Sequence, residues 1–129
     1  MSDTIILGND PALVNMMLLA YKVASENSKD KSTQNSAVIV TPGQLVAGVN
    51  GLNSRIADKP ERHERPAKYM YYEHAERNAI YGCAAQGIAT QGLTMIAPWA
   101  ACADCARAII AAGITHLITH KSDAPEHNL

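Results

Sequence analysis

Four reactive residues constrain the folding of this chain more than any other feature: His74, Glu76, Cys102 and Cys105. One histidine and two cysteines three positions apart are ligands that zinc prefers, and a catalytic zinc site keeps its fourth position for water. The fold must therefore bring His74 to the cysteine pair, although 25 residues separate Glu76 from Cys102. Glu76 then stands beside the metal as a carboxylate that can move protons.

The two halves of this motif are predicted to begin two helices. A helix over residues 102–112 places Cys102 and Cys105 on one face of its first turn. A helix over residues 73–86 places His74 in its own first turn. The positive ends of both helix dipoles favour the thiolate, which is the form of cysteine that binds zinc. We therefore expect two helix N-termini to meet at one zinc ion.

Apolar periodicity and β-branched runs place the other elements. One further helix and four strands are expected, at residues 11–26, 37–41, 45–49, 93–97 and 114–119. Pro42-Gly43 fits the centre of a type II turn, which would join the first two strands as a hairpin. The strand, helix, strand order at the C-terminal end implies a parallel crossover. The chain is therefore predicted to be an α/β protein with a mixed sheet flanked by helices.

Two buried positions follow from the same periodicity. In the helix over residues 102–112, Ile109 and Ile110 are expected to face the core. Cys83 lies on the apolar side of the preceding helix, so it is interpreted as an inert thiol of the core.

Composition limits the class of protein. Hydrophobic residues make up 47% of the chain, which is typical of one globular domain over residues 1–129. The net charge of −1 gives no electrostatic reason to expect nucleic acid as a partner. No window approaches the ~20 apolar residues of a membrane span, so no membrane partner is expected. Only Cys83 remains once two cysteines are assigned to metal, which fits the reducing cytoplasm.

Three segments resemble the cytidine/deoxycytidylate deaminase superfamily, and within it the short deoxycytidylate (dCMP) deaminases of phages and bacteria. They are residues 48–52, 65–80 and 102–110, within a resemblance that extends from residue 37 to residue 119. The resemblance implies a cytidine-deaminase-like three-layer α/β/α fold that holds Zn²⁺. It also implies hydrolytic deamination of dCMP to dUMP and ammonia, in which zinc-bound hydroxide attacks C4 and Glu76 shuttles protons.

The resemblance also assigns contacts to the substrate. Asn50 is expected to hydrogen-bond the sugar or the base, and a plain turn residue is the alternative at this position. The backbone N–H of Ala75 is expected to meet the pyrimidine O2. The carbonyl of Ala100 is expected to accept a hydrogen bond from the exocyclic amine.

Residues 51–72 are predicted to form a long, irregular and charged loop. This loop carries two more basic than acidic side chains. Long loops in compact domains are usually functional, and arginine forks bind phosphate oxygens in pairs. Arg55 and Arg65 are therefore the first candidates to bind the 5′-phosphate of dCMP, and solvated surface is the alternative for each of them.

One position departs from the family pattern. Such deaminases usually have proline directly before the first cysteine, whereas this chain has Ala101 there, with Pro98 and Trp99 just upstream. The ligand spacing is unchanged, so zinc binding is still expected. The wall of the base pocket differs, and this leaves open which pyrimidine, with which 5-substituent, fits.

Other functions stay open on the sequence alone. A deaminase of cytidine, deoxycytidine or a free base would ignore the 5′-phosphate. A deaminase that edits tRNA or single-stranded DNA would need a basic groove and stacking aromatics, but the chain has one Trp and no Phe. A non-catalytic zinc site would need a fourth ligand, from among His63, His116, His120 and His127. The family resemblance also suggests a homo-oligomer, and it leaves control by dCTP or dTTP open.

Overall fold

A mixed four-stranded sheet forms the centre of the computed structural model, which describes residues 11–28, 35–99 and 102–119. In chain order its strands are β1 (Ser36–Val40), β2 (Leu45–Val49), β5 (Thr94–Ile96) and β6 (His116–Ile118). Their order across the sheet is β2–β1–β5–β6. β1 is antiparallel to both β2 and β5, whereas β5 and β6 are parallel. The predicted hairpin and the predicted parallel crossover are both confirmed.

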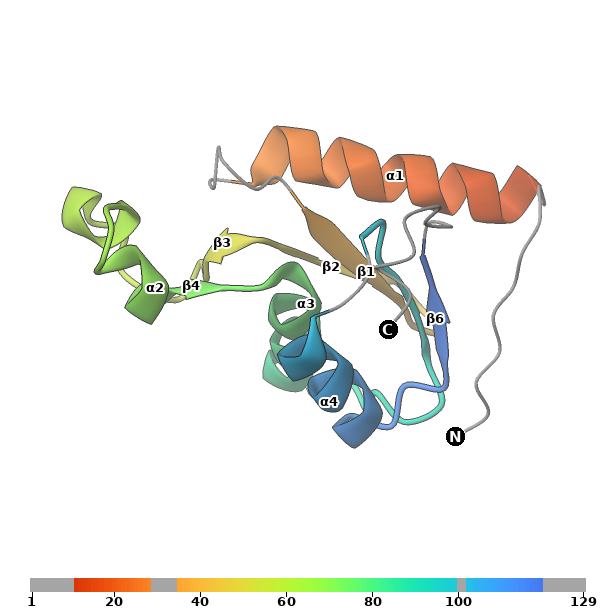
Figure 1. Ribbon diagram of the computed structural model, residues 1–129. Helices are drawn as coiled ribbons and strands as arrows, with labels where there is room; N and C mark the ends of the chain where they lie inside the picture. Colours follow the sequence, from red (N-terminus) through yellow and green to blue (C-terminus); the bar gives the residue numbers. More distant parts are fainter. Residues whose placement is uncertain (1–10, 29–34, 100–101, 120–129) are drawn as a thin grey trace.

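Helices cover both faces of this sheet, as Figure 1 shows. α1 (Pro11–Asn27) lies on one face, while α3 (Ala75–Ala85) and α4 (Ala103–Ala111) lie together on the other. The predicted three-layer α/β/α architecture is therefore confirmed. The helices and strands of its layers are those that the spacing of apolar residues predicted.

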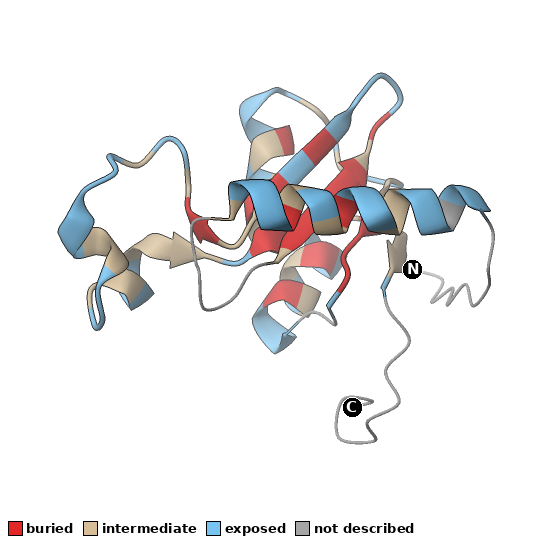
Figure 2. Ribbon diagram, turned by 90° about the horizontal axis from the view of Figure 1, so that it is seen from above, coloured by how far each residue is buried: buried red, intermediate tan, exposed pale blue. Residues whose placement is uncertain are grey.

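Side chains alternate along β1 between two apolar clusters. Ala37 and Ile39 join the cluster on the α3 and α4 side, which includes Ile109, whereas Val38 packs with Ala20 of α1. Successive residues of a strand point to opposite faces, so one central strand supplies both cores. In Figure 2, α1 turns an exposed side outward, and buried residues lie in the sheet beneath it.

The hairpin turn differs from the predicted type. A type II turn would need a positive φ at Gly43, and Gly43 does not have one. Thr41 closes the loop instead. Its N–H donates to the Gln44 carbonyl at 2.9 Å, and its Oγ1 accepts from the Gln44 N–H at 3.0 Å. The threonine side chain therefore supplies an acceptor that the propensity of Pro42-Gly43 alone does not reveal.

The segment between β2 and α3 is a folded arm that projects from the body of the molecule in Figure 1. It contains two short strands, a 3₁₀ helix and a one-turn helix: β3 (Gly51–Leu52), η1 (Pro60–His63), α2 (Lys68–Tyr71) and β4 (Tyr72–Glu73). β3 and β4 pair antiparallel in a sheet of their own. The prediction of an irregular loop with a helix from residue 73 was therefore wrong in detail, because residue 73 is paired in a strand.

α3 lies directly against β2 at Gly48. A Cβ atom on Gly48 would stand 2.3 Å from the Ala79 nitrogen and 2.4 Å from the Ala75 carbonyl oxygen. Only glycine allows this approach of two backbones. The contact fixes the N-terminal turn of α3, which carries His74 and Glu76, relative to the sheet.

α4 ends where the sequence predicted, but only one of the two residues predicted to face the core does so. Gly113 follows the helix with φ of +77°, a conformation that glycine adopts without strain. Ile109 is buried at 4% exposure, whereas Ile110 is 57% exposed. Adjacent helical positions point about 100° apart, and α4 packs against the sheet and α3 on one side only. Ile110 therefore faces outward.

Cys83 is a core residue of α3, as predicted. It is fully buried in the apolar cluster between the helices and the sheet. Burial raises the pKa of its thiol, so the reactive thiolate is disfavoured.

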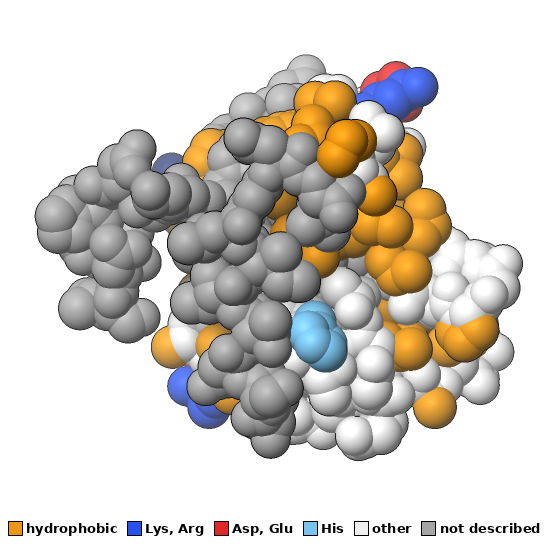
Figure 3. Space-filling model, turned by 90° about the vertical axis from the view of Figure 1, so that its right-hand side faces the viewer, with side chains coloured by type: hydrophobic (Ala, Val, Ile, Leu, Met, Phe, Trp, Pro, Cys, Tyr) orange, Lys and Arg blue, Asp and Glu red, His pale blue; other side chains and the backbone are white. Residues whose placement is uncertain are grey.

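The surface beside the β6 edge of the sheet is mostly uncharged. Figure 3 looks onto this side, where the described side chains are largely hydrophobic or neutral, with few Lys, Arg, Asp or Glu residues. Within the described parts of the chain, no helix combines the length and the apolar character needed to cross a membrane.

Candidate metal-binding active site

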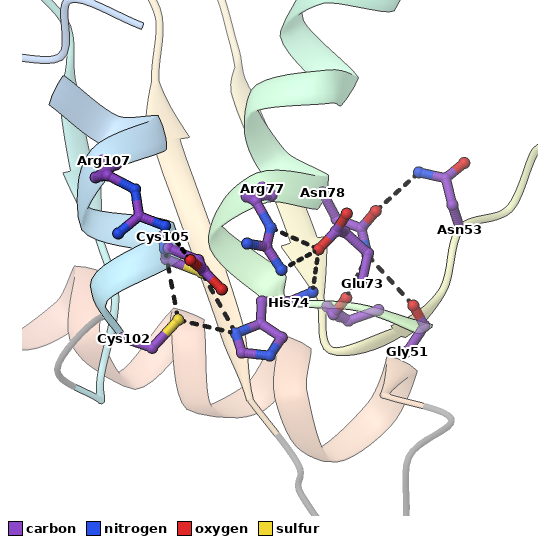
Figure 4. A network of polar contacts seen from close by, with 11 residues as sticks. Gly51, Asn53, Glu73, His74, Arg77, Asn78, Cys102, Cys105 and Arg107 are labelled. Carbon is purple, nitrogen blue, oxygen red and sulfur yellow. Dashed lines mark hydrogen bonds and ion pairs between the residues drawn. The ribbon is translucent and has the colours of Figure 1, made fainter. Parts of the chain in front are cut away.

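The N-termini of α3 and α4 meet at the predicted metal site. His74 is the N-cap of α3, with φ −73° and ψ 151°, and Cys102 is the N-cap of α4, with φ −67° and ψ 169°. Cys105 follows one turn into α4, and Figure 4 shows the three side chains pointing toward one another. The Cys102 sulfur also accepts the Cys105 N–H at 3.4 Å, so it caps its own helix. The predicted convergence of two helix N-termini is confirmed.

The three donor atoms have the spacing of a tetrahedral site. His74 Nδ1 lies 3.4 Å from Cys102 Sγ and 3.3 Å from Cys105 Sγ, and all three donors lie within 4.8 Å of one another. With Zn–S bonds of ~2.3 Å and Zn–N bonds of ~2.0 Å, tetrahedral ligands stand about 3.5–3.8 Å apart. The group therefore fits a zinc ion after a movement of a few tenths of an ångström.

A fourth protein ligand is not found in the part of the chain that the structure describes. His63 lies in the arm, where its ring nitrogens contact Asp58 Oδ1 and the Tyr72 hydroxyl, each at 2.5 Å. His116 lies on β6, where its Nδ1 is 3.0 Å from the hydroxyl of the preceding threonine. The predicted alternatives His120 and His127 fall outside the described residues. Three protein donors, the number found among the described residues, is also the number of protein ligands in a catalytic zinc site.

Burial and neighbouring acidic groups act on the Cys105 thiol. Cys105 is fully buried, and burial together with the neighbouring Glu76 raises the pKa of its thiol well above its ordinary value. The second thiol, Cys102, acts in the same direction. A divalent cation at this point would reverse the balance, because it stabilises both thiolates directly.

Arg77 and Glu73 form an ion pair beside the metal donors. Arg77 donates to Glu73 Oε1 from its Nε at 2.6 Å and from a terminal nitrogen at 2.5 Å. Glu73 Oε1 also accepts the His74 N–H at 3.0 Å. Burial disfavours the charge on Arg77, but Glu73 and the two cysteines outweigh it and raise the pKa of the guanidinium. This pair, which the sequence analysis did not identify, braces the N-cap of α3 (Figure 4).

Glu76 is the second residue of α3 and is 3% exposed. Its Oε1 accepts a hydrogen bond from Asn35 Nδ2 at 3.3 Å. Sequence analysis missed Asn35, because residues 25–36 have the composition of a solvated connection without apolar side chains. The only signal was its place two residues before the predicted strand over residues 37–41.

Asn50 and Ala75 both lie close to this site. Asn50 donates its N–H to the Asn35 carbonyl at 3.0 Å and accepts the Ser28 hydroxyl at 2.9 Å with its own carbonyl. Ala75 is the first residue of α3 and is fully buried between His74 and Glu76. The structure therefore brings both residues near the catalytic candidates, while their contacts with substrate stay predictions.

The chain just before Cys102 is described only in part. Ala100, the predicted acceptor of the exocyclic amine, and Ala101 fall outside the described residues. Trp99 is 55% exposed and Pro98 is buried. This exposure of Trp99 is compatible with a position at the rim of the base pocket.

The two arginines predicted to bind phosphate lie in the arm, on different surfaces. Arg55 lines a cavity of about 800 Å³ between β2, α3 and the arm, and none of the three metal donors is among its lining residues. Arg65 is exposed, and its guanidinium stands 5.8 Å from the centre of the Tyr69 ring. The structure does not bring these arginines together, so phosphate binding by either stays a prediction.

Comparison with known families decides what kind of protein this is. The sequence model of a family described as the cytidine and deoxycytidylate deaminase zinc-binding region matches residues 12–121. The chain belongs to this deaminase family. Family membership and the geometry of the His-Cys-Cys group together identify Zn²⁺ as the metal that His74, Cys102 and Cys105 are placed to hold.

Relatives of this chain come from bacteria and mammals. An uncharacterized deaminase encoded in the luxG 3′ region of Aliivibrio fischeri is 37% identical over 92 residues, which are 68% of this chain and 58% of the relative. The deoxycytidylate deaminase of Mus musculus is 31% identical over 110 residues, which are 79% of this chain and 60% of the relative. The chain thus spans about 60% of the length of the curated relatives it matches.

The chain shares its fold with a solved phage enzyme. The dCMP deaminase of cyanophage S-TIM5, in its apo form, superimposes with a TM-score of 0.70 at 22% sequence identity, covering 92% of this chain and 90% of the phage protein. The same enzyme in complex with dCMP and dUMP gives a TM-score of 0.65 at 21% identity, covering 88% of this chain and 86% of the phage protein. At these identities the likeness establishes the fold.

Proposed function

We propose that this chain catalyses the zinc-dependent hydrolytic deamination of dCMP to dUMP and ammonia. The observation that carries the proposal is the buried carboxylate of Glu76, placed beside the three metal donors found among the described residues. Support for dCMP comes from the relatives named deoxycytidylate deaminase and from the phage enzyme that binds dCMP and dUMP.

The chemistry follows from the residues around the metal position. His74, Cys102 and Cys105 would hold the zinc, which would supply Lewis acidity and lower the pKa of a water molecule at the site from ~15.7 toward ~7. Glu76 would take a proton from the attacking water and deliver it to the ring nitrogen, and it would then take the remaining proton of the new C4 hydroxyl and pass it to the amino group, which leaves as ammonia while the C4 carbonyl forms. One carboxylate can serve all three transfers because it is buried and held in place on the first turn of α3.

Backbone groups next to Glu76 orient the base. The N–H of Ala75 lies in the first turn of α3, where helical N–H groups have no partner within the helix, so it can donate to the pyrimidine O2. Asn50 binds the sugar or base, and the Ala100 carbonyl accepts from the exocyclic amine. Arg55 and Arg65 are the candidates for the 5′-phosphate.

The proposal also covers the organisation of the protein. We infer that residues 1–129 form a single zinc-dependent deaminase domain that works in the cytoplasm. Family membership supports a homo-oligomer, which gel filtration coupled to light scattering would detect.

The substrate is tested by comparing dCMP with deoxycytidine on purified, zinc-loaded protein, with ammonia release as the signal. A large preference for dCMP supports the proposal and a phosphate contact. Equal rates would make the protein a nucleoside deaminase. No turnover of either, at one zinc per chain, would contradict the proposal and direct the assay to oligonucleotides and then to a structural role for zinc.

The role of Glu76 is tested by Glu76→Gln, with Glu26→Gln as a matched control. Glu26 is exposed near the end of α1, so its replacement should leave turnover unchanged. Glu76→Gln should keep zinc and lose at least ~10²-fold in kcat, because the amide cannot carry protons. Wild-type turnover in the zinc-replete Glu76→Gln variant would remove Glu76 from the mechanism.

A further inference from the structure

Asn35 links the start of β1 to the catalytic candidate on α3. Its Nδ2 donates to Glu76 Oε1 at 3.3 Å, its Oδ1 accepts the Ser36 N–H at 2.9 Å, and its carbonyl accepts the Asn50 N–H at 3.0 Å. Three hydrogen bonds thus fix one residue that lies 41 positions from Glu76 in the sequence.

The orientation of the Asn35 amide follows from these partners. A backbone N–H can only donate, so the amide oxygen must face Ser36. The amide nitrogen is left facing Glu76, and it donates to Glu76 Oε1. Neither end of the amide can be exchanged without losing both bonds.

The support behind Asn35 is rigid. Ser36 is fully buried, and its hydroxyl donates to the Ala20 carbonyl of α1. Ser36 also begins β1, a central strand of the sheet, and pairs there with Val49. The donor that meets Glu76 is therefore held by the sheet and by α1, independently of α3.

We propose that Asn35 is a positioning residue that holds Glu76 in its productive orientation. A carboxylate in a helix can rotate about its terminal bonds, and a charge-assisted hydrogen bond limits this rotation. With Oε1 held by Asn35, Oε2 is the oxygen that takes up and returns protons. This inference rests on the proposed function, because it acts through the proton transfers of Glu76.

The central test is Asn35→Ser. A serine side chain can still accept the Ser36 N–H but is too short to reach Glu76. We expect kcat for deamination to fall about 10- to 100-fold, with KM changed less than about threefold and zinc content unchanged. Asn15→Ser, an exposed position on α1, is the matched control and should keep wild-type kinetics.

Asn35→Asp separates positioning from local structure. Aspartate keeps the acceptor for Ser36, but it replaces the donor with a second carboxylate facing Glu76. If Asn35 only caps the start of β1, Asn35→Asp will keep both melting temperature and kcat. If it positions Glu76, Asn35→Asp will lose at least as much kcat as Asn35→Ser.

A double-mutant cycle tests the contact itself, without any turnover. Unfolding of wild type, Asn35→Ser, Glu76→Ala and the double variant should show a coupling of about threefold or more in the unfolding equilibrium constant. Coupling below this value, or an Asn35→Ser variant with wild-type kcat in an active enzyme, overturns the inference and leaves the proposed function standing. A wild-type protein without deaminase activity on any cytosine compound overturns both.

Discussion

Replacing Gly48 with alanine should separate α3 from β2 and disturb the metal site. The new Cβ would lie 2.3 Å from the Ala79 nitrogen and 2.4 Å from the Ala75 oxygen, whereas ordinary contact begins at 3.4 Å. Both neighbours are backbone atoms, so α3 must retreat by about 1 Å, and overpacking of this kind costs about 3 kcal/mol. For a domain of this size that cost lowers the melting temperature by roughly 10 °C.

The same retreat should weaken zinc binding, because α3 carries His74 while both cysteines lie on α4. Thermal unfolding of apo protein measures the packing cost, and competition with a fluorescent chelator measures the zinc affinity. Both quantities should change together in Gly48→Ala.

Two other glycines provide graded controls. A Cβ added to Gly43 would meet no atom within 4 Å, and Gly43 has no positive φ, so Gly43→Ala should be neutral or slightly stabilising. In Gly82→Ala the Cβ meets only Val46 Cγ1, at 3.0 Å, and alanine favours the helix by up to ~1 kcal/mol, so a small net change is expected. A Gly48→Ala protein that melts and binds zinc like Gly43→Ala would refute the argument that direct backbone contact places α3.

Zinc removal and pH provide further tests. Chelation should lower the melting temperature, because zinc at 100 times its Kd stabilises the folded state by about 2.7 kcal/mol. The Cys105→Ser variant should have the same melting temperature with and without zinc. Burial raises the pKa of the Cys83 thiol from 9.0. Its contribution to stability is therefore complete below pH 9.0 and is lost as the pH rises through the folded-state value. Unfolding followed from about pH 8 to about pH 10.5 should show this decline, and Cys83→Ala should show less of it.

The strands and helices that build the layers could be predicted because each carries a period that fits its burial. β1 alternates between two cores, and α1 follows a helical spacing, so local patterns and the final fold agree. The pairing of Gly51–Leu52 with Tyr72–Glu73 could not be predicted in the same way. Two-residue strands are too short to show alternation, and their pairing depends on how the arm folds back.

The errors within predicted elements also have physical causes. Ile110 is apolar and adjacent to the buried Ile109, but burial on a helix depends on which neighbours cover each side. The turn after β1 depends on a side-chain acceptor from Thr41, which competes with the turn type that Pro42-Gly43 favours. Tertiary packing left Ile110 exposed, and a local hydrogen bond to the Thr41 side chain determined the turn.

The metal-donor group was more predictable than the expected substrate contacts because its residue types have few other uses. A histidine and two cysteines at these spacings rarely occur together without a metal, so their types alone indicate that they meet in space. Asparagine and arginine occur on most surfaces, and their roles depend on what surrounds them. Asn35 has a role only because β1 and the first turn of α3 bring it to Glu76 at 3.3 Å. Arg55 and Arg65 have long side chains on an arm whose course no local pattern reveals, so the sequence alone could not place them relative to the metal donors.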